Sequence, residues 1–363
     1  MTEIYPMRFL VRGRGQSRSS GRLSCIDFFS KIEIEHDTLW LMGLESGKKP
    51  GGSKEDDLER LPLLQGATNR NKIFLDSSGD IFYKLENKKE QEHYKIIDTF
   101  RKELEQKGVM FPTLLETRQI TSDEGLYVGV TRIPNFHAFD IAEHFGAYTD
   151  PDPNPSFIAF LAALDSIATT IPAQHFEEED EEALSAVLMF VNQAYDLIKE
   201  DVENIVGQKE LADLFTKSQK YIQDIPRVVQ HKDANSSNWR TVKVENKIFV
   251  NMLDLETLGV ARREWDEGRM YSLLCLDEGK QEIFKNLVLD HAAFEDVSQQ
   301  IYFWRVVLFR SIRELNLIHT EKYRAPLEQY TNTQGGENIK EDIKKGLLRN
   351  IKHSVTELNV RMT

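Results

Sequence analysis

The sequence has few of the features that mark several common classes of protein. Of its 363 residues only Cys25 and Cys275 are cysteines, and neither belongs to a CxxC or Cys/His spacing. This argues against a disulfide framework and against a structural zinc site. No run of about 18 apolar residues occurs, so a membrane span is not expected. These absences predict a soluble protein of the reducing cytoplasm.

The chain also has no excess of positive charge. It carries 46 Lys and Arg against 59 Asp and Glu, a net charge of −13. Binding to nucleic acid requires a basic face that neutralises phosphates, so a general nucleic-acid binder is not expected. The sequence contains neither a GxxxxGK[ST] motif nor a nucleophile elbow, so P-loop nucleotide binding and acyl transfer have no support. The length predicts two lobes.

The amino-terminal segment differs in charge from the rest of the chain. No acid occurs between Ile4 and Ile26, where five arginines lie among Gly and Ser. This composition is typical of an organellar transit segment and also of a tail that contacts nucleic acid. The interpretation we prefer is simpler: a flexible basic extension, or a misassigned start with Met7 as the true first residue. The Gly- and charge-rich stretch at 46–57 reads as a linker, so residues 1–57 are predicted to precede the folded part.

Residues 58–134 predict a small antiparallel sheet with one helix. The expected elements are strands at 72–75 and 81–85, a helix at 88–107, and strands at 113–120 and 126–133. In the helix, Ile96, Phe100 and Leu104 lie four residues apart, Glu92 lies one turn earlier, and Gly108 is a plausible stop.

Residues 135–363 predict a larger, mostly helical lobe. Long apolar or amphipathic helices are expected at 157–171, 183–202, 210–222 and 301–315. Two short strands, 227–230 and 247–253, interrupt them, and each leads directly into polar residues. The predicted fold class is therefore α+β and bilobal.

The polar residues after these two strands suggest a metal site. His231, Asp233 and Asn238 follow the first strand, and Asp254 ends the second. Two adjacent strand ends would bring Asp233, Asn238 and Asp254 to one point, and such oxygen ligands suit Mg²⁺. Taken singly, Asp233 also fits a helix cap or an Asx turn, and Asp254 a turn residue.

Upstream residues suggest a phosphate site. The turn Gly66-Ala67-Thr68-Asn69 lies between strands, where backbone N–H groups can approach phosphates. Lys84, at the end of a strand, can reach an anion, and Glu92 can hold its ammonium group. Lysines also end edge strands simply as solvated residues. Together with the metal site, these groups supply what phosphoryl transfer needs.

These motifs resemble the aminoglycoside phosphotransferase and choline kinase-like family, which has a protein-kinase-like fold. The resemblance is carried by QGATN with Lys84 and Glu92, by HKDANSSN at 231–238, by FVNMLDLE at 249–256, and by Asp266 in REWDEG. The motifs follow the family's order from about residue 60 to residue 270, and the helical remainder to about 320 resembles its large lobe.

The resemblance implies a role for each matching residue. Asp233 would orient or deprotonate the acceptor hydroxyl, while Asn238 and Asp254 would hold Mg²⁺. His231 would support the loop, and Asp266 would brace it.

The same resemblance places the nucleotide. Lys84, paired with Glu92, would contact the α- and β-phosphates beneath the turn Gly66 to Asn69. The backbone around Val128 and Val130 would face adenine.

Three positions depart from the family pattern. Lys232 stands where the family commonly has the glycine of HGD, and it would either narrow the acceptor site or point to solvent. Gln65 stands where a first glycine is frequent in the phosphate turn. Asn235 occupies the position at which protein kinases place a basic residue two after the aspartate. The last departure favours a small-molecule acceptor over a protein.

The function expected from the resemblance is ATP- and Mg²⁺-dependent transfer of a phosphoryl group to a hydroxyl of a small molecule. The acidic run at 177–182 would attract a cationic acceptor, such as an aminoglycoside, an amino sugar or a choline-like compound, unless it is only a solvated helix start. Two alternatives stay open. One is a non-catalytic, kinase-like nucleotide-binding module that regulates a partner protein. The other is a kinase for protein or RNA that docks through the basic tail.

Overall fold

A computed structural model of the protein describes most of the chain from β1 onward. The described residues are 74–75, 81–86, 88–119, 126–131, 140–147, 153–176, 183–244, 247–289, 296–334 and 338–363. The predictions for the basic extension, the linker and the turn Gly66 to Asn69 lie outside these ranges. So do both predicted boundaries, at 57/58 and 134/135.

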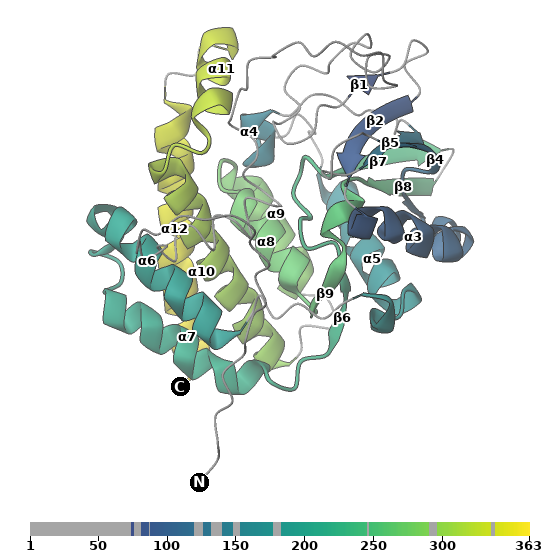
Figure 1. Ribbon diagram of the computed structural model, residues 1–363. Helices are drawn as coiled ribbons and strands as arrows, with labels where there is room; N and C mark the ends of the chain where they lie inside the picture. The colour runs from purple at the N-terminus through teal and green to yellow at the C-terminus, as the bar shows by residue number, and fades with distance from the viewer. Residues whose placement is uncertain are drawn as a thin grey trace, which may run out of the picture.

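The small lobe contains an antiparallel sheet and a helix, as the sequence predicts. Its elements are β1 (Phe74–Leu75), β2 (Ile81–Glu86), α3 (Lys88–Gln106), β4 (Leu114–Gln119) and β5 (Leu126–Thr131). The strand order is β1-β2-β5-β4, and all three pairings are antiparallel. Figure 1 shows this sheet and α3 on one side of the molecule, with the long helices on the other.

Buried side chains hold α3 in position, and a glycine ends the helix. Tyr94, Ile97 and Leu104 are buried, whereas Ile96 and Phe100 are only partly covered. The buried face is therefore turned from the row that the sequence pattern suggested. The helix ends before Gly108, whose φ of +89° is a left-handed conformation that glycine adopts without steric cost.

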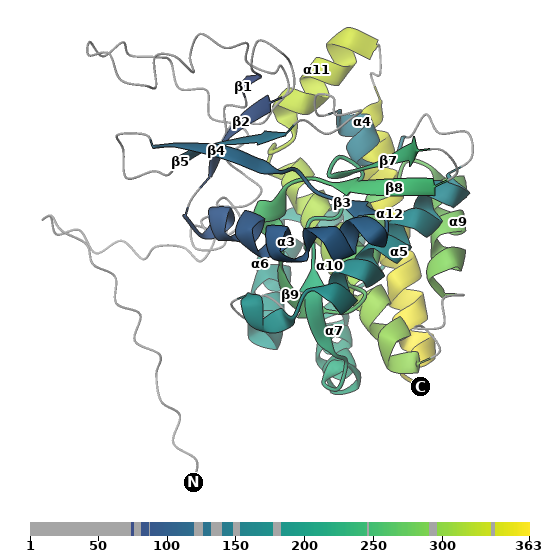
Figure 2. The same ribbon diagram turned by 90° about the vertical axis from the view of Figure 1, so that its right-hand side faces the viewer.

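A second sheet joins the segment after α3 to the large lobe. It has the order β3-β8-β7, from β3 (Val109–Met110), β8 (Lys247–Met252) and β7 (Trp239–Val244). The pairing of β3 with β8 is parallel, and that of β7 with β8 is antiparallel. This sheet packs against α5, as Figure 2 shows. A third, two-stranded pairing links β6 (Arg227–Gln230) and β9 (Gly259–Arg262).

The large lobe is mostly helical, and its helices include those that the sequence predicts. They are α4 (Ile141–His144), α5 (Asn154–Thr170), α6 (Leu184–Val202), α7 (Gln208–Ile222), α8 (Trp265–Leu273), α9 (Glu278–Leu289), α10 (Val297–His319), α11 (Arg324–Gln334) and α12 (Ile339–Arg361), with the short 3₁₀ helices η2 (Ala173–His175) and η3 (Leu255–Thr257). Among the described helices, none has the length and hydropathy that crossing a membrane requires.

Helix α10 is the centre of this lobe. It packs against α6, α7, α8 and α12, and Ile301, Phe303 and Leu308 are completely buried. Its buried residues also include polar ones, among them Arg305, Arg310 and Glu314, so α10 is covered on nearly every face. The fold is thus α+β and bilobal, as predicted, with the HKDANSSN motif (231–238, the proposed catalytic loop) between β6 and β7.

Candidate active site

The loop after β6 is held in place through His231. This side chain is completely buried, and its Nε2 donates a hydrogen bond to the carbonyl oxygen of Leu253. Its Nδ1 lies 3.4 Å from Oγ1 of Thr257. Both partners belong to the segment around Asp254, so the imidazole links the two strand ends. These contacts fit a supporting role.

Asp266, at the start of α8, fixes the backbone of the same loop. Its Oδ2 accepts a hydrogen bond of 2.7 Å from the backbone N–H of His231, and the side chain is completely buried. Burial raises the pKa of Asp266, whereas the charge of His231 and hydrogen bonds from the backbone of His231 and Lys232 act in the opposite direction. Asp266 therefore lies where the resemblance places a brace.

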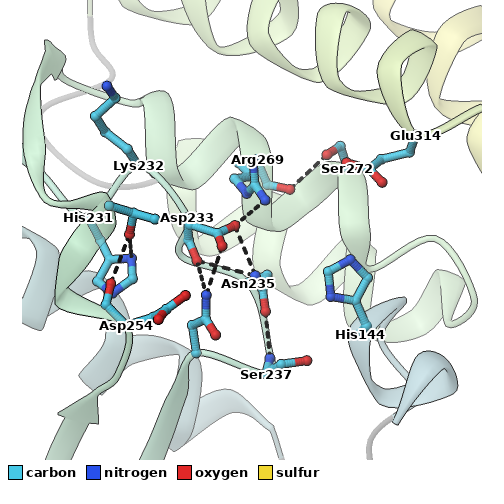
Figure 3. Close-up of polar contacts among 12 residues, drawn as sticks. His144, His231, Lys232, Asp233, Asn235, Ser237, Asp254, Arg269, Ser272 and Glu314 are labelled. Atoms are coloured by element: carbon cyan, nitrogen blue, oxygen red, sulfur yellow. Dashed lines mark hydrogen bonds and ion pairs between the residues drawn. The ribbon is translucent and has the colours of Figure 1, made fainter. Parts of the chain in front are cut away.

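Asp233 is the one carboxylate of residues 231–238, and hydrogen-bond donors surround it. Nδ2 of Asn238 lies 2.9 Å from its Oδ2 and 2.9 Å from its carbonyl oxygen. Nδ2 of Asn235 lies 3.0 Å from Oδ1, and the guanidinium of Arg269 pairs with the same oxygen. Figure 3 shows these donors around the carboxylate. Donors on both oxygens fix the orientation of the carboxylate and stabilise its charge.

The contacts of Asn238 define the direction of its amide. A carboxylate and a backbone carbonyl only accept hydrogen bonds, so the group that Asn238 turns toward Asp233 is its NH₂. Its Oδ1 therefore faces the other way. An amide oxygen is a suitable ligand for a hard cation such as Mg²⁺. The metal role of Asn238 stays a prediction.

Asp254 follows β8 and lies beside Asn238 in the fold. Trp239 is paired with Met252, and the N–H of Leu253 donates to the carbonyl of Asn238 over 2.8 Å. Asp254 itself is left-handed, with φ 61° and ψ 58°. Left-handed residues other than glycine are uncommon, and they concentrate at functional sites.

The structure brings together the segments that carry the three predicted residues. Asn238 contacts Asp233, and its carbonyl oxygen accepts from Leu253, the neighbour of Asp254. A shared metal at their side chains stays a prediction. Among the described residues there is no cluster of three His, Cys, Asp or Glu that suits a metal ion. A metal here would consequently depend on the amide of Asn238 as well as on carboxylates.

Lys232, which replaces the usual glycine, adopts the backbone conformation of a glycine. Its φ is +64°. Its side chain points away from Asp233 in Figure 3, and its stem lies over Gly259 of β9. A Cβ at Gly259 would lie 2.9 Å from Cδ of Lys232, so the glycine makes room for the lysine. The lysine is directed toward β9, not toward the carboxylate of Asp233.

The predicted nucleotide residues are only partly described. Lys84 lies opposite Val128, and Phe82 opposite Val130, in the β2-β5 pairing. The side chains of these four residues and the turn Gly66 to Asn69 are outside the description, so their roles stay predictions.

Glu92 is half-exposed and accepts a hydrogen bond of 2.6 Å from Lys95. Its pairing with Lys84 also stays a prediction. The next residue, His93, is buried, and its Nδ1 lies 2.8 Å from the carbonyl oxygen of Leu255. It ties α3 to the segment after Asp254.

Two groups at the loop were missed by the sequence reasoning. Arg269 was not recognised, although it lies one helical turn after Asp266 and therefore on the same face of α8. The link between α4 and the loop was also missed. In that link Oγ of Ser236 donates to the carbonyl of Glu143 over 2.6 Å, and Arg240 forms an ion pair of 3.2 Å with the Glu143 carboxylate. No local sequence pattern predicts this contact between α4 and the loop.

The match to a protein family agrees with this geometry. Residues 59–283, more than half of the chain, match the model of the phosphotransferase enzyme family known as APH. The chain therefore belongs to this family of phosphotransferase enzymes. No curated protein matches the chain.

Solved structures show the fold of the family. The microcompartment-associated aminopropanol kinase is 14% identical, with 84% of this chain and 94% of that chain covered and a TM-score of 0.53. A spectinomycin phosphotransferase, solved with ADP and spectinomycin, is 15% identical, with 83% and 92% covered and a TM-score of 0.50. At these identities the likeness establishes the kinase-like fold.

Proposed function

We propose that the protein transfers the γ-phosphoryl group of ATP to a hydroxyl of a small molecule in a Mg²⁺-dependent reaction. The observation that carries the proposal is the contact of Asn238 with Asp233 in a loop that His231 and Asp266 anchor next to the segment of Asp254. Family membership supports the reaction class. The names of the aminopropanol kinase and the spectinomycin phosphotransferase support a small-molecule acceptor.

Each residue would have one task. Asp233, oriented by its amide and guanidinium donors, would accept a hydrogen bond from the attacking hydroxyl and aim its oxygen at the phosphorus. Oδ1 of Asn238 and the carboxylate of Asp254 would hold the metal. When bound, Mg²⁺ would neutralise charge on the phosphate oxygens. Positioning and charge stabilisation would account for the rate, because phosphoryl transfer needs no covalent enzyme intermediate.

The small lobe would bind the nucleotide. Residues 58–134 would form this lobe and 135–363 the acceptor lobe, with the reaction between them. Lys84 would contact the α- and β-phosphates beneath the turn at 66–69, and Glu92 would hold Lys84 in place. The β5 backbone at Val128 and Val130, which pairs with β2, would face adenine.

We also propose a cationic acceptor and a cytoplasmic location. The acidic run at 177–182 supports the first, and the scarcity of cysteine supports the second. Glu143, the acid that α4 brings to the loop, is already paired with Arg240. A cationic acceptor would therefore meet its counter-charge elsewhere in the acceptor lobe.

A transfer assay tests the proposal. Wild-type protein and Asp233→Asn are incubated with Mg²⁺ and [γ-³²P]ATP over a panel of amino sugars, aminoglycosides, amino alcohols and neutral sugars. We expect label to appear on an acceptor with the wild type and to be lost with Asp233→Asn, while both bind ATP. Binding of ATP by the wild type without transfer to any member of the panel would favour the non-catalytic module.

A further inference from the structure

Arg269 forms a buried ion pair with the carboxylate that the proposed reaction depends on. Its guanidinium contacts Oδ1 of Asp233, and the two side chains are only 5% and 12% exposed. Exposed ion pairs contribute little because water screens them. A buried pair differs, because removal of one partner leaves the other charge without compensation. The environment of Asp233 is therefore set as much by α8 as by its own loop.

Helix α8 contacts the catalytic loop twice from one face. Asp266 holds the backbone at His231, and Arg269, one turn later, holds the side chain of Asp233. The helix is pressed tightly against α10, since a Cβ at Gly268 would lie 2.8 Å from Cβ of Val306. A guanidinium presented from such a packed helix has little freedom to move.

We infer that Arg269 is a positioning residue for phosphoryl transfer, an inference that rests on the proposed function. Together with Asn235 it holds Oδ1 of Asp233, while Asn238 holds Oδ2. The carboxylate thereby keeps one orientation and its negative charge toward the attacking hydroxyl. A misplacement of about 1 Å at a reacting group costs on the order of 100-fold in rate. The contribution of Arg269 is to prevent such a misplacement.

The primary test compares three variants with the wild type. Arg269→Gln removes the charge, and Arg269→Lys keeps the charge but loses the planar fork. Arg305→Gln is the matched control, because Arg305 is equally buried but donates to Ser218 and Gln219 of α7. Turnover is measured as release of ³²P-phosphate from Mg·[γ-³²P]ATP, with water as acceptor, and nucleotide affinity by calorimetry with Mg·ADP.

We expect Arg269→Gln to lower kcat about 100-fold with the Kd for Mg·ADP within about twofold, and Arg269→Lys to recover part of the loss. Arg305→Gln should keep kcat within about threefold for the folded fraction. Wild-type kcat in Arg269→Gln would overturn the inference. An equal loss in Arg305→Gln would also overturn it, because the effect would then follow from removing any buried arginine.

A second measurement does not depend on activity. Urea unfolding of Arg269→Gln, Asp233→Asn and the double variant forms a double-mutant cycle. Because each single change breaks the pair, we expect the double variant to be more stable than the sum predicts, by at least about tenfold in the folding equilibrium constant. If the stability changes of the two single variants simply add up in the double variant, Arg269 and Asp233 do not form an ion pair. If the double-mutant cycle shows coupling but the wild type neither hydrolyses ATP nor phosphorylates any member of the acceptor panel, the proposed function fails and Arg269 serves folding alone.

Discussion

Replacement of Glu264 by glutamine is expected to stabilise the protein, and increasingly so as the pH rises. Glu264 precedes α8 and is completely buried. Burial, followed by the nearby charge of Glu267, raises the pKa of Glu264 to about 9. Burial also raises the pKa of Glu267 to about 8. The neighbouring cation Arg263 is 3.8 Å from Oε1 of Glu264 and is paired with Asp165.

The direction of the effect follows from linkage. The carboxyl is neutral in the folded protein up to a pH of about 9, whereas in the unfolded chain it ionises near 4.5. The free energy of unfolding therefore has its full value below pH 4.5 and falls as the pH rises toward 9. Each pH unit in this window costs about 1.4 kcal/mol. At pH 7.5 the cost from Glu264 reaches about 4 kcal/mol.

Glutamine removes this cost without changing the shape of the side chain. Oε1 of Glu264 accepts a hydrogen bond of 3.1 Å from Nε2 of Gln299, and the amide oxygen of a glutamine can accept the same bond. Glu264→Gln should thus be up to about 4 kcal/mol more stable at pH 7.5 and nearly unchanged at pH 4.5.

Urea unfolding at pH 5, 7.5 and 9 measures the effect. Glu200→Gln, at an exposed position of α6, is the matched control and should show no such pH-dependent gain. An advantage of Glu264→Gln that does not grow between pH 5 and 7.5 would refute the reasoning, because it would mean that Glu264 is ionised in the folded protein.

Two further predictions concern the packing of the helical lobe. Burial opposes ionisation of Asp201, but hydrogen bonds from His319 and Lys344 outweigh it and lower the pKa of Asp201. Asp201→Asn should therefore lower the free energy of unfolding, measured in urea at pH 7, by about 1 kcal/mol. This difference should vanish as the pH falls through the pKa of Asp201 in the folded protein, which lies below 3.8. A loss that does not depend on pH would contradict the prediction. Gly346→Ala should destabilise by about 1–3 kcal/mol, because a Cβ would overlap a backbone carbonyl just after α8. Gly207→Ala, which has open space, is its control, and equal unfolding midpoints for both would contradict the expected clash.

Local sequence patterns were sufficient to predict part of this fold. The runs at 227–230 and 247–253 formed strands because β-branched and apolar residues suit a buried sheet, and both strands end at the expected polar residues. Helix α3 ended before Gly108 as predicted, because a left-handed residue there costs glycine nothing.

Features that depend on contacts between distant segments could not be predicted in this way. The parallel pairing of the two-residue strand β3 with β8 is an example, because so short a strand has no pattern of its own. The exposed position of Glu92 is another. Its row with Ile96 and Phe100 matched a helical period, but the neighbouring lobe covers Tyr94 and Ile97 instead.

The candidate site shows the same division. The sequence predicted that 227–230 and 247–253 end side by side as adjacent strands, and this was wrong, because β6 pairs with β9 whereas β8 pairs with β3 and β7. Asn238 lies beside the end of β8 because it directly precedes β7, which pairs with β8. The partner of Asp233 on α8 was not predictable, because 36 residues separate Arg269 from it and only the packed fold brings them together.

The central claim is that Asp254 and Asn238 hold the metal-bound nucleotide while Asp233 serves the acceptor. Calorimetric titration of the wild type, Asp254→Asn and Asp233→Asn with ATP, in the presence and absence of Mg²⁺, tests it most directly. We predict that Asp254→Asn weakens Mg·ATP at least about tenfold, or ~1.4 kcal/mol, and that Asp233→Asn binds like the wild type. Equal, Mg²⁺-dependent binding by the wild type and Asp254→Asn would contradict the account.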